Sequence, residues 1–98
     1  MASKWKIVKD GSLVGVLDLI EIDQPWFRCR FSPEAGWTAV ESLFESMASA
    51  HRRRDYERYG ELLIAVRSLG LTLEPMSEGD SIVPIMIKIE GDEASFRY

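Results

Sequence analysis

The amino-acid sequence begins and ends with pairs of β-rich runs that meet at an aspartate–glycine turn. Near the start, "KWKIVK" and "SLVGVLDLIEI" flank Asp10-Gly11, and near the end "IVPIMIKIE" and "EASFRY" flank Gly91-Asp92. Such pairs adopt positive φ at little steric cost and therefore favour the tight turns of β-hairpins. We predict an antiparallel hairpin at each end of the sequence.

The stretch "PWFRCRFSP" predicts a further strand. Pro25 is tolerated at the start or edge of a strand, and the residues after it alternate between an apolar face and a mainly basic face. The second arm of the first hairpin lacks this alternation, because it carries the apolar doublets Leu13-Val14, Val16-Leu17 and Leu19-Ile20. We therefore expect both faces of that strand to need cover.

Two amphipathic helices are predicted between these strands. Ser32-Pro33-Glu34 has the side chains of a helix start, so the first helix is expected over about residues 33–50. The second is expected from about Arg53 to Leu69, because Gly70 suits the left-handed residue that ends a helix. The expected buried stripes are Trp37, Val40, Phe44 and Met47 in the first helix, and Tyr56, Tyr59, Leu63, Val66 and Leu69, or Leu62 beside them, in the second.

With a short strand expected over residues 71–74, the elements follow one another in the order βββ-αα-β-ββ. This order predicts the α+β class, with an antiparallel sheet and a two-helix pair packed on one face. The 98 residues, 46% of them hydrophobic and 29% charged, have the size and composition of one folded domain, which we place at residues 1–98.

The sheet face without helices is the expected interaction surface. It combines apolar and basic side chains, as surfaces that bind a partner often do. We interpret the chain as a non-enzymatic protein–protein interaction module that forms a homodimer, or docks an unidentified protein partner, through this face or a free sheet edge. The residues expected on this face are Trp26, Arg28, Arg30, Pro84 and Met86, with Lys88 and Arg97 beside them.

The stretch "HRRRDYERYG" supports an alternative function. Arg52, Arg53 and Arg54 could together bind an anion through charge-assisted hydrogen bonds. However, the net charge of the sequence is -4, and Asp55 and Glu57 are close enough to the arginines to form solvated ion pairs on a helix. Anion or nucleic-acid binding is therefore the alternative, and we do not expect nucleic acid to be the partner.

Residue patterns typical of catalysis and of metal binding are missing from the sequence. Cys29 alternates with two phenylalanines and is expected to be a buried, inert thiol. His51 is the only histidine, and no spacing joins it to Cys29 as a base beside a nucleophile. We predict no enzymatic activity, no cofactor and no metal. A third interpretation is small-ligand binding between helices and sheet, where Cys29 and His51 are the only unusual chemistry and Trp26 could stack on a ligand.

The segments "WKIVKDGSLVG", "DQPWFRCRFSP", "WTAVESLFESM" and "IKIEGDEASFRY" give the chain a layout that resembles a family of small uncharacterised bacterial proteins of the actinobacterial type. The resemblance covers nearly the whole chain. It implies no activity, ligand or site residue.

Cysteine content and hydropathy bear on location. A single cysteine suits a reducing compartment better than a disulfide scaffold. The sequence shows neither a signal peptide nor a transmembrane segment, so we expect a cytoplasmic protein without membrane contact.

Overall fold

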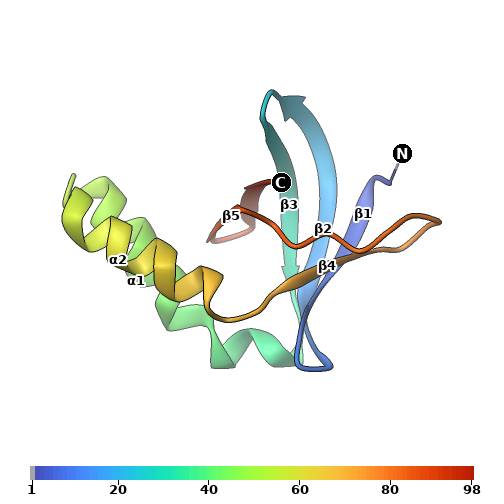
Figure 1. Cartoon of the computed structure of the whole chain (residues 1–98), viewed down its shortest axis with the longest axis horizontal. Coiled ribbons are helices and arrows are strands. Elements are labelled where there is room, and N and C mark those ends of the chain that lie inside the picture. The colour runs from blue at the N-terminus through green and yellow to red at the C-terminus, as the bar shows by residue number, and fades with distance from the viewer. Residues whose placement is uncertain (1) are drawn as a thin grey trace.

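The computed structural model describes residues 2–98 and contains an antiparallel sheet and a pair of α-helices (Figure 1). The prediction of an α+β fold with an antiparallel sheet is confirmed. The strands are β1 (Lys4–Lys9), β2 (Ser12–Asp23), β3 (Trp26–Pro33), β4 (Thr72–Pro75), β5 (Met86–Glu90) and β6 (Glu93–Arg97). The helices are a 3-10 turn η1 (Ala35–Ala39), α1 (Glu41–Arg52) and α2 (Tyr56–Arg67).

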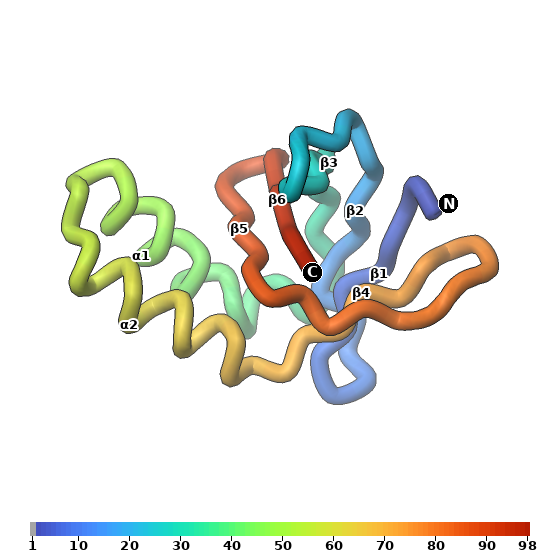
Figure 2. Tube along the Cα trace, turned by 45° about the horizontal axis from the view of Figure 1, so that its top comes forward, coloured from blue at the N-terminus to red at the C-terminus, as the bar shows by residue number. Residues whose placement is uncertain are grey.

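The sheet curls so far that its two ends are joined by a short piece of chain (Figure 2). Its strands lie in the order β4-β1-β2-β3-β6-β5, and Ile82 forms an antiparallel bridge with Leu73 on the outer side of β4. In a flat sheet, Ile82 and β5 would be about 29 Å apart, since neighbouring strands are about 4.8 Å apart. Met86 is only four positions after Ile82, and four residue steps span at most about 14 Å. The sheet must therefore bend into a half-barrel.

The inner face of the half-barrel holds an aromatic core. The Trp5 ring packs edge-on against Phe96, with centroids 5.1 Å apart, and Phe27 stacks on Phe96 at 5.1 Å. The helix pair lies beside β5, and Phe44 and Met47 of α1 belong to the same buried cluster as these aromatic residues (Figure 1). One continuous core therefore joins the helices to the sheet.

The outer face of the sheet carries acidic as well as basic side chains. Register places Lys4, Asp18, Arg30, Glu93 and Glu90 next to one another across β1, β2, β3, β6 and β5. Opposite charges on directly facing residues stabilise antiparallel strands. This row contains two basic and three acidic residues, with Glu93 directly facing Glu90, whereas the sequence suggested a mainly basic face.

The apolar doublets of β2 reflect two β-bulges. Ile7 pairs with Gly15 and Val8 with Leu13, which leaves Val14 as the extra residue of the first bulge. In the second bulge Ile20 is the extra residue, and it is 61% exposed. A bulge inserts one residue and so shifts the inward–outward alternation. The expectation that both faces of this whole strand need cover was therefore wrong.

Both helices start later than the sequence suggested. Strand β3 continues to Pro33, which pairs with Gly15, so the predicted helix start at Ser32-Pro33-Glu34 is wrong and α1 begins only after the η1 turn. Asp55 caps α2 by accepting a hydrogen bond from the Arg58 backbone N–H at 3.2 Å. Tyr56 in the first turn of α2 is 67% exposed, not buried as expected.

Pro84 does not lie on the outer face, which corrects its predicted place at the interaction surface. It is buried and borders a small hollow with Leu63 and Val66 of α2. Proline has no backbone N–H to donate to a neighbouring strand. The hydrogen bonds to β6 accordingly begin after it, where the Ile85 N–H donates to the Arg97 carbonyl at 2.8 Å.

Candidate functional site

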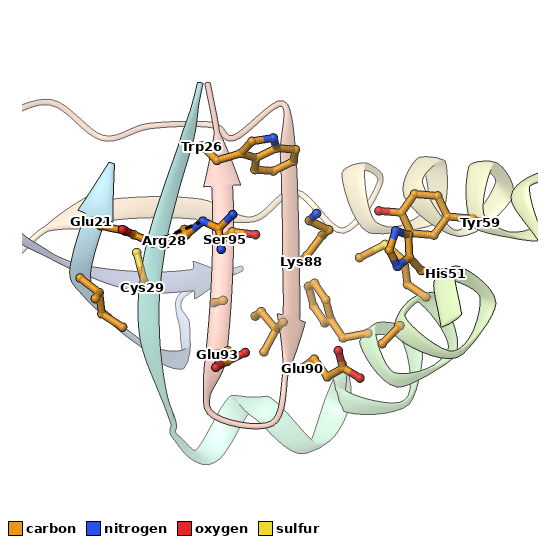
Figure 3. Close-up of a pocket in the computed structure, with 16 residues that line it drawn as sticks. Glu21, Trp26, Arg28, Cys29, His51, Tyr59, Lys88, Glu90, Glu93 and Ser95 are labelled. Atoms are coloured by element: carbon orange, nitrogen blue, oxygen red, sulfur yellow. Dashed lines mark ion pairs between the residues drawn. The ribbon is translucent and has the colours of Figure 1, made fainter. Parts of the chain in front are cut away.

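The helix–sheet cleft is a hollow of about 520 Å³ where the helix pair meets strands β3, β6 and β5 (Figure 3). Its volume falls in the usual range of small-molecule pockets, about 300–1,000 Å³. The sheet supplies Trp26, Arg28, Lys88 and Ser95, α1 supplies Ala48 and His51, and α2 supplies Tyr59.

Lys88 and Trp26 form the most specific contact in this cleft. The Lys88 Nζ lies 4.3 Å from the centroid of the Trp26 ring, and both side chains are half-buried. A cation in this position contributes about 0.5–2 kcal/mol, depending on how far it is desolvated. Within residues 2–98, no carboxylate lies within ion-pair distance of Lys88. The ammonium group is therefore held in place while its charge is not neutralised by a carboxylate.

Other cations in and beside the cleft do have acidic partners. Arg28 pairs with Asp23 at 3.0 Å and with Glu21 at 3.7 Å. Arg52 forms an ion pair with Glu90, which joins the end of α1 to β5. These pairs leave Lys88 as the lysine of the cleft without an ion-pair partner, and Glu93, which also lines the cleft, likewise forms no ion pair with a described residue.

His51 and Tyr59 form the opposite wall of the cleft (Figure 3). Their rings are 5.4 Å apart, and no hydrogen bond joins either side chain to another described group. Burial raises the pKa of the Tyr59 hydroxyl, so the phenol stays protonated and can donate a hydrogen bond.

Cys29 borders the cleft but is only 2% exposed. Burial, followed by the nearby negative charge of Asp18, raises the pKa of its thiol from 9.0 to about 12. A thiol with so high a pKa is protonated at neutral pH and is a poor nucleophile. The interpretation of Cys29 as a buried, small apolar residue agrees with this environment.

The predicted interaction residues are only partly brought together. Trp26 and Arg28 line the cleft, and Met86 lies two residues from Lys88 on the same face of β5. Arg30 lies two residues after Arg28 in β3 and forms an ion pair with Asp92 at 3.5 Å. The two edges of the sheet offer a partner less free backbone than expected. Ile82 forms a bridge on the outer side of β4, and α1 lies beside β5 (Figure 2).

The arginine cluster lies outside the cleft. Arg52 ends α1 and is already paired, whereas Arg53 and Arg54 are exposed in the turn before α2. Anion binding by these residues stays a prediction. No local sequence pattern predicted the contact of Lys88 with Trp26 or the position of Tyr59 opposite them, because long-range strand pairing decides the first and the packing of α2 decides the second.

Within residues 2–98, no group of three or more His, Cys, Asp or Glu residues is placed to hold a metal ion. No described helix has the length and hydropathy needed to cross a bilayer.

Comparison of the chain with protein-family models, curated proteins and solved structures gives no match. The resemblance to small bacterial proteins stays a prediction.

Proposed function

We propose that the chain is a non-enzymatic binding domain that holds a small organic anion in the helix–sheet cleft. The observation that carries this proposal is the Lys88 ammonium, which is fixed against Trp26 and has no carboxylate partner among the described residues. The cleft is lined by both apolar and polar side chains, and polar groups placed around a pocket fix the orientation of a ligand.

The residues of the cleft suggest how such an anion is held. Lys88 supplies the positive charge, and the protonated Tyr59 hydroxyl supplies a hydrogen-bond donor from the opposite wall. The half-buried Trp26 ring offers an apolar surface for the body of the ligand. A carboxylate joined to a flat ring meets all three requirements.

The protonated thiol of Cys29 and the surroundings of His51 support binding without chemical conversion. Cys29 is buried and its pKa is about 12, so a thiolate is not available at neutral pH. His51 has no carboxylate or hydroxyl partner within hydrogen-bond distance that would orient it as a general base.

The proposal is tested by titrating the isotope-labelled protein with benzoate while recording ¹H–¹⁵N spectra. We expect benzoate to shift the Trp26 indole signal and the amide signals of Lys88 and Ser95. The uncharged isostere benzamide should bind several-fold more weakly. Lys88→Met should remove this preference, whereas Lys6→Met, which changes an exposed lysine of β1, should leave it unchanged. Equal binding of both probes, or no shift around the cleft at millimolar benzoate, would contradict the proposal.

Self-association through the same face is a second proposal. It rests on the accessible apolar side chains at this face, namely the 61% exposed Ile20 and the half-buried Trp26 and Met86. Light scattering over a dilution series should then report a dimer that persists in high salt, and Trp26→Glu should dissociate it. A wild-type monomer at every concentration would exclude this dimer.

A further inference from the structure

Glu93 supplies the helix–sheet cleft with a carboxylate that the proposed anion site does not use. It starts β6, is exposed, and forms no ion pair with a described residue. Strand register places it directly opposite Glu90 of β5. Like charges on directly facing residues destabilise an antiparallel pair. A cation beside Glu93 would therefore relieve a repulsion that the register of the sheet creates.

The arginines nearest to Glu93 are paired with other carboxylates. Arg30 faces Glu93 across β3 and β6, but its guanidinium pairs with Asp92 at 3.5 Å. Arg52 of α1 reaches the facing residue, Glu90, and pairs with it. Among the described residues, neither arginine therefore neutralises Glu93.

The charges that line the cleft are unfavourable for a simple anion. Two are positive and three are negative, namely Arg28 and Lys88 against Glu21, Glu90 and Glu93. A carboxylate bound at Lys88 adds to this negative excess, and unit charges a few ångströms apart repel one another most strongly where water is partly excluded. A ligand that carries its own ammonium group adds no net charge to the cleft.

The positive and the negative group of the cleft are separated along the strands. Lys88 pairs with Ser95, and Glu93 lies two residues before Ser95 on the same face of β6. Two residues of a strand span about 7 Å. Figure 3 shows Trp26 and Lys88 toward one end of the cleft and Glu93 with Glu90 toward the other. A ligand that meets both ends must carry its two charges at opposite ends of its body.

We infer that the cleft takes an amino acid whose carboxylate and ammonium groups stand at opposite ends of an apolar body. The carboxylate lies at Lys88 and Tyr59, the body lies beside Ser95, and the ammonium group lies at Glu93. An α-amino acid, which has both groups on one carbon atom, is too short for this span. The inference rests on the proposed anion site and adds a cation to its ligand, so the anion site can stand without it.

The probe for this ligand class is 4-(aminomethyl)benzoate, in which a flat ring separates the carboxylate from the ammonium group. Its matched analogue is 4-(hydroxymethyl)benzoate, which has the same shape and carboxylate but no positive charge. In ¹H–¹⁵N titrations both should shift the Trp26 indole signal. The zwitterion should bind several-fold more tightly and should shift the Glu93 amide signal further than the analogue does.

Glu93→Gln tests which residue holds the ammonium group. The variant should fold, because Glu93 is exposed and faces another carboxylate. It should lower the preference for the zwitterion by up to about fivefold, the usual limit for an exposed ion pair. Glu74→Gln is the control, because Glu74 is an exposed strand carboxylate that does not line the cleft, and it should leave the preference unchanged.

Two results would overturn the inference. One is equal or tighter binding of 4-(hydroxymethyl)benzoate by the wild type, and the other is a preference for the zwitterion that Glu93→Gln leaves intact. Neither result changes the comparison of benzoate with benzamide, which tests the anion site at Lys88. Failure of the ammonium site is therefore distinguishable from failure of the proposed function.

Discussion

Lys88 Nζ lies 4.3 Å from the centroid of the Trp26 ring, although β5 and β3 are separated by β6. Between them stands Ser95, which pairs with Lys88 on one side and with Arg28 on the other. The small serine side chain lets the long lysine side chain cross the middle strand. The contact therefore depends on the pairing of β3 with β6, which joins segments more than 60 residues apart.

Lys88→Met should retain the fold and lower the free energy of unfolding by about 0.5–1 kcal/mol. The substitution keeps much of the aliphatic chain over Trp26 but removes the cation from a half-exposed aromatic ring. Urea unfolding measures the change, and Trp26→Leu in the same background should then cost less than it does in the wild type. If the destabilisation of the double variant equals the sum of the two single variants, the contact between Lys88 and Trp26 contributes no stability.

Cys29 should react slowly with thiol reagents in the folded protein and rapidly after unfolding. The side chain is 2% exposed, and its thiol stays protonated because burial and Asp18 raise its pKa to about 12. Labelling with and without denaturant measures this difference. Fast labelling under native conditions would place Cys29 at an accessible, reactive surface.

The same pKa predicts a loss of stability in alkali. Between pH 9.0, the ordinary pKa of the thiol, and about 12, the unfolded chain releases a proton that the folded chain retains. Stability is unaffected by this group below pH 9 and falls above it, by at most about 1.4 kcal/mol per pH unit. Urea unfolding at a series of pH values measures the slope. Cys29→Ala should show a shallower decline, and an unchanged slope in this variant would contradict the assignment.

Gly15→Ala should destabilise the fold, and Gly60→Ala should stabilise it. A Cβ at Gly15 would lie 2.7 Å from the Ser32 carbonyl oxygen and would also meet the Phe31 ring, so we expect a loss of about 1–3 kcal/mol. Gly60 lies inside α2 with nothing within 4 Å of the added Cβ, and alanine there should add about 0.5–1 kcal/mol. Thermal unfolding of the two variants compares them directly, and equal effects would argue against the close approach of β2 to β3 at Gly15.

Asp55→Ala should destabilise α2 by about 1 kcal/mol, since the carboxylate accepts a hydrogen bond from the Arg58 backbone N–H. Circular dichroism during urea unfolding measures both helix content and stability. Asp55→Asn keeps a side-chain acceptor and is the control, so it should lose only a small part of the stability. An asparagine variant as unstable as the alanine variant would point to charge instead of capping.

The sequence by itself determined the turns and the alternation of side chains. Asp10-Gly11 and Gly91-Asp92 form the predicted hairpins, and β3 presents Cys29 to the core as its pattern indicated. These features follow from the φ angles that glycine and aspartate accept and from the two-residue period of a strand, both of which are local. The α+β class follows from the same local signals.

Only the tertiary structure decided the bulges, the curl of the sheet and the sites that result. Val14 and Ile20 look like ordinary strand residues, and the bulges appear only when β1 and β3 pair with β2. The approach of Lys88 to Trp26 likewise needs β6 between the two outer strands. Register and curvature arise from contacts between distant segments, which no pattern of neighbouring residues records.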